Sequence, residues 1–157
     1  MVNWVTDRSS GKQYVKLSTT VNRANDAARL CDGVGGILPE PRNSQENDFV
    51  NIILGTSGFC FLGLTDTGAE GQWVWSSNGS TPAWSFWGGG EPDGGRDEHC
   101  AVHIYQRHLS NWHKVWTPTE CIHWQNIPVV CEKTRKYTIY HQDLLKTTAN
   151  RPGLVKI

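Results

Sequence analysis

The spacing of apolar residues near the start of the chain predicts a strand followed by a helix. Residues 13–17 alternate between polar and apolar side chains, which is the period of a half-buried strand. Over residues 24–31, alanines and a cysteine recur at i, i+3, i+4 and i+7, the spacing of one helix face. Thr19 and Thr20 precede this face, and we expect them to cap the helix.

A second helix is predicted to begin at Asn43. Asn43 and Glu46 have the spacing of a capping box, in which the first side chain accepts a hydrogen bond from a backbone N–H three residues later. Phe49, Ile52 and Ile53 form the apolar stripe that we expect this helix to bury.

The remaining apolar runs are too short for helices and predict strands. An Asn-Gly turn is expected at 77–80. Residues 81–98 are rich in Gly and Pro and have almost no periodicity, so they predict a long loop, and long loops in compact domains are usually functional. The expected strands cover residues 59–64, 72–76, 99–105 and 127–131.

Length and charge limit the class of protein. The chain has 157 residues, the size of one domain, and its 15 basic and 15 acidic residues lack the basic excess of a general nucleic-acid binder. No apolar run reaches about 18 residues, so we expect no membrane span. Residues 1–10 lack the apolar stretch of a signal peptide, so the chain is expected to be either cytosolic or a mature form without its leader.

The cysteines favour the second of these two choices. None of the five forms a CxxC pair, and wide spacing in a Gly- and Trp-rich chain favours disulfides and an oxidising compartment. Spacing alone leaves their pairing open and one cysteine over. Four of the eight tryptophans lie between Trp73 and Trp87 and predict a packed aromatic core. The cysteines are Cys31, Cys60, Cys100, Cys121 and Cys131.

Acidic residues gather in two places. Asp66 and Glu70 follow a predicted strand, whereas Glu91, Asp93 and Glu98 lie in the long loop. Carboxylates on loops suit calcium, which takes roughly six to eight oxygen ligands in loose geometry. If the bond between Glu91 and the following proline is cis, the side chains on both sides of the proline can point to one side of a tight turn.

The order of these motifs resembles the C-type lectin-like domains over residues 4–133. Residues 61–64 (Phe-Leu-Gly-Leu) resemble the core signature Trp-Ile-Gly-Leu of that family, and residues 73–75 resemble the strand that follows it. Residues 91–93 (Glu-Pro-Asp) stand where the family has Glu-Pro-Asn or Gln-Pro-Asp. Residues 134–157 lie outside the resemblance, and their polar, mildly basic sequence predicts a mobile tail.

The resemblance implies an α+β fold, in which two helices flank antiparallel sheets below a long irregular ligand loop. It also implies two disulfides, Cys31–Cys131 and Cys100–Cys121. The odd cysteine, Cys60, is then expected to be a buried thiol beside the core strand.

The resemblance also implies a divalent metal site in the long loop. Glu91, Asp93 and Glu98 match three ligands of the principal calcium site of the family. Thr117 and Pro118 replace an Asn and an Asp of that site, so the negative charge is retained while the number of oxygen ligands falls. This combination leaves the ion open between calcium and zinc.

Further metal ligands follow from the same comparison. We expect His99 or His113 to supply a nitrogen that shifts the preference toward zinc. Asp66 and Glu70 stand where the family has carboxylates of an auxiliary calcium site, or else they are solvated loop charges. His99 and His103 are expected on one strand, about 13 Å apart, which is too far for both to bind one ion. We therefore interpret them as ordinary surface histidines rather than as a zinc-binding pair.

For a sugar ligand, Glu91, Asp93 and Glu98 offer only acceptors when ionised, so sugar hydroxyls must donate to them. We expect mannose- or glucose-type ligands because Glu91 keeps the first position of the family motif. Trp112 and Trp116 are candidates either to stack on a sugar face or to pack under the long loop. Asn78 begins a glycosylation sequon, although the Asn-Gly turn explains the same residues.

The sequence therefore predicts a non-enzymatic, secreted lectin that recognises microbial surface glycans in innate immunity with a bound divalent metal. No nucleophile elbow or acid–base pair supports an enzyme. The alternative is a lectin-like domain that has lost metal and binds a protein, which the replaced residues Thr117 and Pro118 favour. Oligomerisation is left open.

Overall fold

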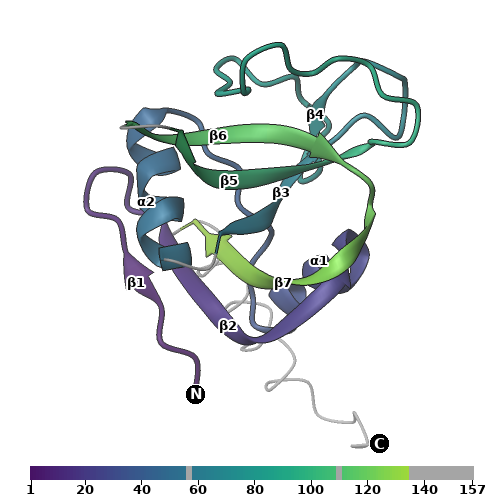
Figure 1. Ribbon diagram of the computed structural model, residues 1–157. Coiled ribbons are helices and arrows are strands. Elements are labelled where there is room, and N and C mark those ends of the chain that lie inside the picture. Colours follow the sequence, from purple (N-terminus) through teal and green to yellow (C-terminus); the bar gives the residue numbers. More distant parts are fainter. Residues whose placement is uncertain (56–57, 109–110, 135–157) are drawn as a thin grey trace, which may run out of the picture.

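The fold consists of two antiparallel sheets flanked by two helices (Figure 1). The computed structural model describes residues 1–55, 58–108 and 111–134, without the side chains of 106–108 and 111–113. One sheet has the strand order β1-β2-β7 and the other β4-β3-β5-β6, which confirms the predicted α+β class. The elements are β1 (Val5–Thr6), β2 (Gln13–Arg23), α1 (Ala24–Gly33), α2 (Ser44–Leu54), β3 (Phe59–Thr65), β4 (Val74–Trp75), β5 (Cys100–His108), β6 (Asn111–Thr119) and β7 (Ile122–Lys133).

The long loop between β4 and β5 rises above the four-stranded sheet, at the far end of the molecule from the N-terminus (Figure 1). Its predicted position is confirmed. The sequence pattern does not predict β6, which pairs with β5 along its whole length, or the early start of β7 at Ile122. The tail predicted for 134–157 lies outside the described residues after Thr134.

The first helix begins without a side-chain cap. Pairing between β2 and β7 continues as far as Arg23, so Thr19 and Thr20 lie within β2, and the prediction that they cap α1 is wrong. The backbone N–H of Ala24 instead donates to the carbonyl of Cys121 at 2.9 Å. A tertiary contact thus satisfies one of the unpaired N–H groups of this helix end.

The second helix has the predicted cap but buries a different face. The Asn43 Oδ1 accepts from the Glu46 N–H at 2.9 Å, which confirms the cap. Ile52 is 67% exposed, so its place in the buried stripe was predicted wrongly, while Phe49 and Ile53 are partly buried. The residues of α2 that are buried are Glu46, Asn47, Val50 and Leu54.

Two polar residues can face the core on α2 because each has partners there. The buried Lys12 Nζ donates to the Glu46 Oε2 at 2.8 Å, to the Glu132 Oε1 at 3.1 Å and to the Glu40 carbonyl at 3.1 Å. Asn47 accepts from the Trp116 Nε1 at 2.8 Å. Buried polar groups are tolerated when they are hydrogen-bonded in this way.

Both disulfides implied by the resemblance are present. Cys31–Cys131 joins α1 to β7 and closes a loop with a sequence separation of 100 residues. A chain-entropy model gives roughly 4–5 kcal/mol for a loop of that length. Cys100–Cys121 joins the start of β5 to the segment before β7. Cys60 is a buried free thiol, as predicted, and burial raises its pKa to about 12.

An aromatic cluster supports the base of the long loop. Trp75 and Trp116 are fully buried, with ring centroids 5.7 Å apart, and Trp84 and Trp87 contact Trp116 at 5.5 and 5.8 Å. The predicted aromatic core is confirmed. Because Trp116 has no exposed surface, it cannot stack on a sugar, and the packing alternative holds for this residue.

His103 is fully buried, so its interpretation as a surface histidine is wrong. It lies on β5 opposite Cys60 of β3, and its Nδ1 bonds the Asn47 Oδ1 at 3.1 Å. Burial, and to a smaller extent the positive charge of the nearby Lys114, lower the pKa of His103 to about 4.

This depressed pKa predicts acid sensitivity. In the unfolded chain His103 becomes protonated as pH falls below about 6.5, whereas in the folded protein its buried imidazole stays neutral down to about pH 4. We expect stability to be complete above about pH 6.5 and about 3 kcal/mol to be lost by pH 4. Urea unfolding of His103→Gln should show a weaker pH dependence over this window, while the partly exposed His123→Gln retains that of the wild type. Equal slopes for His103→Gln and wild type would contradict the assignment.

Candidate functional site

The carboxylate motif of the long loop forms a tight turn. The Glu91–Pro92 bond is cis, the condition under which the side chains of Glu91 and Asp93 were expected to share one side. The Glu91 Oε2 accepts from the Asp93 N–H at 3.1 Å, and the Asp93 Oδ1 accepts from the Gly95 N–H at 3.3 Å. Gly94 has a φ of 82°, a conformation that favours glycine. These contacts orient both carboxylates by local backbone hydrogen bonds.

The start of the loop is anchored on β6. The Gly88 N–H donates to the Trp116 carbonyl at 2.8 Å, and the Trp116 N–H donates to the Phe86 carbonyl at 2.8 Å. The side chain of Trp116 is locked in the aromatic cluster, so its backbone is a rigid support. Trp116 thus contributes to the site by holding the loop.

Glu98 lies against the backbone of the same loop and close to other carboxylates. A Cβ placed on Gly95 would lie 2.7 Å from the Glu98 Oε2, so only glycine fits there without moving Glu98. Partial burial raises the pKa of Glu98, and the negative charges of Asp93, Glu91 and Glu120 raise it further. These four carboxylates form a group whose charges act on Glu98, and a cation would relieve the repulsion. They do not bring three ligand atoms within 4.8 Å of one another, which in the described part of the chain only Asp66, Glu70 and His99 do.

Glu120 is the member of this group that sequence reasoning missed. It is exposed and lies directly before Cys121, two residues after Pro118. Comparison with the family motif directed attention to positions 117 and 118, where ligands are lost. One signal was available in the sequence. Glu120 is next to Cys121, and Cys121 is joined to Cys100, which lies two residues after Glu98.

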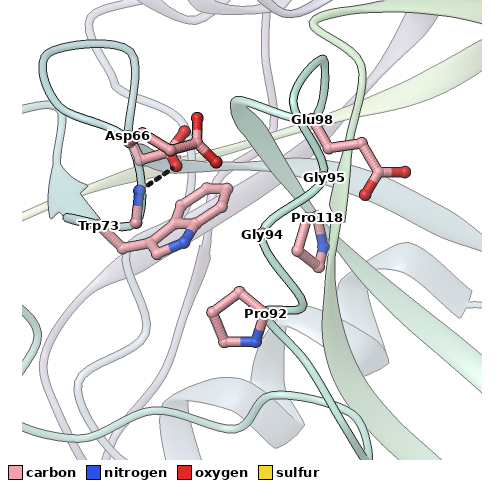
Figure 2. A pocket seen from close by; sticks show the side chains of 9 residues that line it. Asp66, Trp73, Pro92, Gly94, Gly95, Glu98 and Pro118 are labelled. Carbon is pink, nitrogen blue, oxygen red and sulfur yellow. Dashed lines mark hydrogen bonds between the residues drawn. The ribbon is translucent and has the colours of Figure 1, made fainter.

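A small pocket separates the two acidic groups. It has a volume of about 120 Å³, and Pro118 forms part of its wall, as Figure 2 shows. The backbone at Gly94 and Gly95 passes between Asp66 and Glu98 (Figure 2). At about 30 Å³ per water molecule, this pocket has room for roughly four waters, or an ion with part of its hydration shell. We call it the carboxylate pocket.

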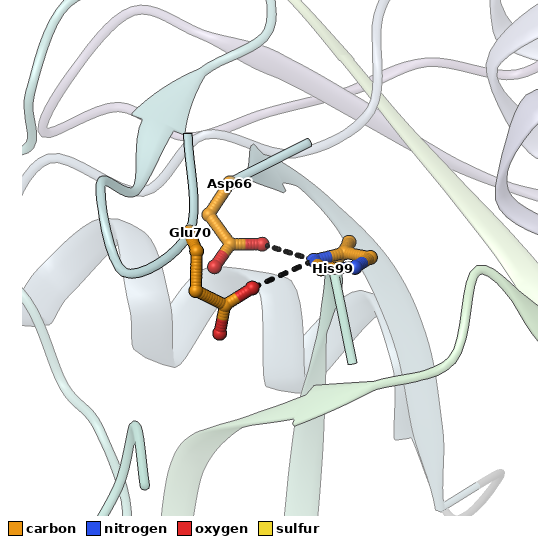
Figure 3. A group of neighbouring side chains, drawn as sticks. All are labelled: Asp66, Glu70 and His99. Atoms are coloured by element: carbon orange, nitrogen blue, oxygen red, sulfur yellow. Dashed lines mark hydrogen bonds and ion pairs between the residues drawn. The ribbon is translucent and has the colours of Figure 1, made fainter. Parts of the chain in front are cut away.

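The structure places His99 with the other acidic group, at the auxiliary site of Asp66 and Glu70, rather than with the loop carboxylates. Its Nδ1 lies 2.9 Å from the Asp66 Oδ1 and 3.6 Å from the Glu70 Oε2 (Figure 3). One ligand atom from each of the three residues lies within 4.8 Å of the other two. The Asp66 Oδ2 also accepts from the Gly71 N–H at 2.8 Å, which fixes this carboxylate.

Charge within this triad of Asp66, Glu70 and His99 is already partly balanced. The hydrogen bond with Asp66 raises the pKa of His99, and the charges of Asp66 and Glu70 raise it further. When the imidazole is protonated, its charge offsets some of the negative charge, and a metal ion would have to compete with this proton. Since the triad offers one nitrogen, it suits zinc better than calcium.

Two residues that were expected to bind ligand, one a sugar and the other a metal ion, lie at the start of β6. The side chains of Trp112 and His113 are not among those described. The backbone of His113 precedes Pro118 by five residues on β6, which corresponds to about 17 Å along the strand. The prediction of His113 as a metal ligand lies outside the described side chains.

Asn78 lies in the predicted turn. Its Oδ1 accepts from the N–H and the hydroxyl of Ser80, at 3.0 and 2.7 Å. Gly79 has a φ of 70°, and its N–H donates to the Trp75 carbonyl. These contacts are sufficient to explain the Asn-Gly-Ser sequence as a turn, and the side chain of Asn78 is exposed.

Comparison with known proteins identifies the family. Residues 20–133 match the family described as "Lectin C-type domain", and the chain belongs to it. It is 31% identical over 103 residues to the mannose-binding protein of Gallus gallus, covering 66% of this chain and 37% of that protein. It is 29% identical over 101 residues to the perlucin-like protein of Mytilus galloprovincialis, covering 61% and 64%. The chain thus spans less than two thirds of the length of these relatives.

Solved structures of C-type lectin domains have the same fold as this chain. The C-type lectin domain of murine dendritic cell inhibitory receptor 2, in complex with an N-glycan, superposes with a TM-score of 0.68 at 25% identity, covering 84% of this chain and 96% of that one. The human scavenger receptor C-type lectin carbohydrate-recognition domain gives the same TM-score at 24% identity, which supports the fold alone.

Family membership settles the class of protein. The chain has a carbohydrate-binding fold, and C-type lectin domains are not enzymes, which confirms that prediction. The comparisons do not favour the alternative of a protein ligand. C-type lectin domains generally bind calcium, and the described part of this chain contains one group of acidic and histidine side chains, Asp66, Glu70 and His99, that could hold a metal ion. No helix in the described part of the chain is long and apolar enough to cross a membrane.

Proposed function

We propose that the chain is a secreted lectin that binds neutral glycans through a calcium ion held by Glu91, Asp93 and Glu98. The proposal is supported by the cis Glu91–Pro92 turn, which carries Glu91 and Asp93, and by the charges of these residues, which together with burial raise the pKa of Glu98. Glu120 brings a fourth carboxylate, which would offer an oxygen in place of the ligands absent at Thr117 and Pro118. An all-oxygen site on a loop suits calcium better than zinc.

The sugar would be bound by the same carboxylates. Calcium at this site attracts hydroxyl oxygens, and the ionised side chains of Glu91 and Asp93 accept hydrogen bonds from those hydroxyls. Since Glu91 keeps the first position of the motif, we propose mannose- or glucose-type ligands. The similarity to a mannose-binding protein supports this choice. A role in innate recognition of microbial surface glycans is part of the same proposal.

The triad of Asp66, Glu70 and His99 is proposed as a second, weaker metal site. Its mixed oxygen and nitrogen ligands favour zinc. Because the pKa of His99 is raised, its affinity for metal should fall as pH decreases through the range in which this imidazole is protonated.

The test is a calorimetric titration of the full chain with calcium and with zinc, followed by a glycan screen with each ion. We expect calcium to bind, glycan binding to require it, and EDTA to abolish that binding. A zinc signal that disappears in His99→Ala would belong to the triad and should leave calcium binding unchanged. Undiminished glycan binding in EDTA would contradict the metal-bridged function.

A further inference from the structure

A larger groove lies beside the carboxylate pocket. Its volume is about 440 Å³, compared with about 120 Å³ for the pocket. None of the residues that line the groove has an ionisable side chain, in contrast to the three carboxylates of the pocket. The side chains that form its walls include Trp73, Trp87, Pro82, Pro92, Thr81 and Ser85.

The groove and the pocket are continuous. Gly71, Trp73 and Pro92 line both of them, so a molecule held at the pocket has the groove directly beside it. The pocket, with room for roughly four waters, is too small for a whole sugar ring. The groove falls within the range of about 300–1,000 Å³ that is typical of small-molecule sites. Pro92 lies between the proposed sugar-binding residues Glu91 and Asp93 and lines the groove, so a ligand that places hydroxyls at these carboxylates has the groove as an adjoining space.

The walls of the groove are held in place by the core. Trp73 and Trp87 contact each other edge to face, with ring centroids 4.9 Å apart, and Trp87 also contacts the buried Trp116. Trp73 is only 8% exposed. Such walls lose little conformational freedom when a ligand enters, which favours binding.

We propose that this groove binds the second, uncharged pyranose residue of a glycan whose first residue is held at the carboxylates. This inference rests on the proposed function, because the first residue positions the second. Indole and pyrrolidine rings offer apolar surfaces to the C–H groups of a sugar ring. The hydroxyls of Thr81 and Ser85 and the amide of Gln72 can exchange hydrogen bonds with sugar hydroxyls.

Charge selects against acidic sugars in the same groove. None of the residues that line the groove is cationic, so a carboxylate on the second residue would lose its hydration without gaining a partner there. A purely apolar chain would leave the polar groups of Thr81, Ser85 and Gln72 without partners on the ligand. The mixture of rings and neutral polar groups matches a neutral sugar.

The test compares mono- and disaccharides on the full chain in calcium. Probes are methyl mannoside, the mannobioses of different linkage, methyl glucoside and maltose, titrated by calorimetry. We expect at least one disaccharide to bind about tenfold more tightly than its methyl glycoside. Saturation-transfer NMR should show magnetisation reaching the C–H groups of the second ring. A disaccharide that ends in a uronic acid should show no gain.

Variants in the exposed segment that borders the groove test whether the gain in disaccharide affinity comes from the groove. Thr81→Arg places a long side chain in the groove and should reduce disaccharide affinity to that of the methyl glycoside, which itself stays unchanged. Ala83→Arg is the matched control, because Ala83 is exposed on the same segment but does not line the groove. It should leave both affinities unaltered.

The outcomes separate the two proposals. If no sugar binds the wild-type chain, the proposed function fails and the inference fails with it. If the methyl glycosides bind in calcium but no disaccharide gains affinity, or Thr81→Arg changes nothing, the inference alone is overturned. Tighter binding of octyl mannoside than of every disaccharide would also overturn it, because the groove would then hold an apolar chain.

Discussion

Glu98→Gln is expected to weaken calcium binding roughly 100-fold and to abolish calcium-dependent glycan binding. The substitution preserves the size of the side chain, which lies against Gly95, and removes a negative charge that is close enough to interact with those of Glu91, Asp93 and Glu120. Calorimetry with calcium measures the first effect, and a glycan screen at a fixed calcium concentration measures the second. Asp97→Asn removes the same charge from an exposed neighbouring side chain and serves as the matched control.

The stability of the calcium-free protein distinguishes a binding role from a structural one. Because the pKa of Glu98 is raised in the folded state, the ionised side chain destabilises the fold at pH values above the ordinary pKa of a glutamate. The metal-free Glu98→Gln variant should therefore be at least as stable as the wild type at pH 7. A variant that loses stability along with glycan binding would make Glu98 a structural residue, and one that still binds glycans would remove this loop from the site.

Lys12→Met is expected to destabilise the fold by about 3–5 kcal/mol, because it leaves buried carboxylates without their cation. Lys12 is the cation shared by Glu46 and Glu132, at 2.8 and 3.1 Å. Burial already raises the pKa of Glu132, and Lys12 counteracts this effect. Urea denaturation at pH 7 measures the change in the free energy of unfolding.

Arg29→Met is the control for the loss of a positive charge. The Arg29 side chain is 82% exposed, and its ion pair with Asp26 has a distance of 4.0 Å, so its removal should cost less than about 1 kcal/mol. Adding Glu132→Gln to Lys12→Met should recover part of the loss, since one uncompensated charge is removed. A loss below about 1 kcal/mol in Lys12→Met would show that the cluster is not held by this ion pair.

Local features of the chain were determined by the sequence itself. The cap at Asn43, the turn at Asn78 and the long loop depend on neighbouring backbone groups and on residues with special backbone preferences, so short patterns predict them. The motif at residues 91–93 and the order of the cysteines were sufficient to indicate the family and thereby both disulfide pairs. These predictions required no knowledge of which faces of the elements meet.

The surroundings of individual side chains were decided only by the tertiary structure. Packing of β6 against the long loop buries Trp116, and the approach of β5 to the end of β3 brings His99 to Asp66 rather than to the loop carboxylates. The Cys100–Cys121 disulfide draws together the segments that contain Glu98 and Glu120. Each of these contacts joins residues that are distant along the chain, and burial and charge depend on such contacts. A periodic pattern contains no information on them, because it reports only which side of an element is apolar.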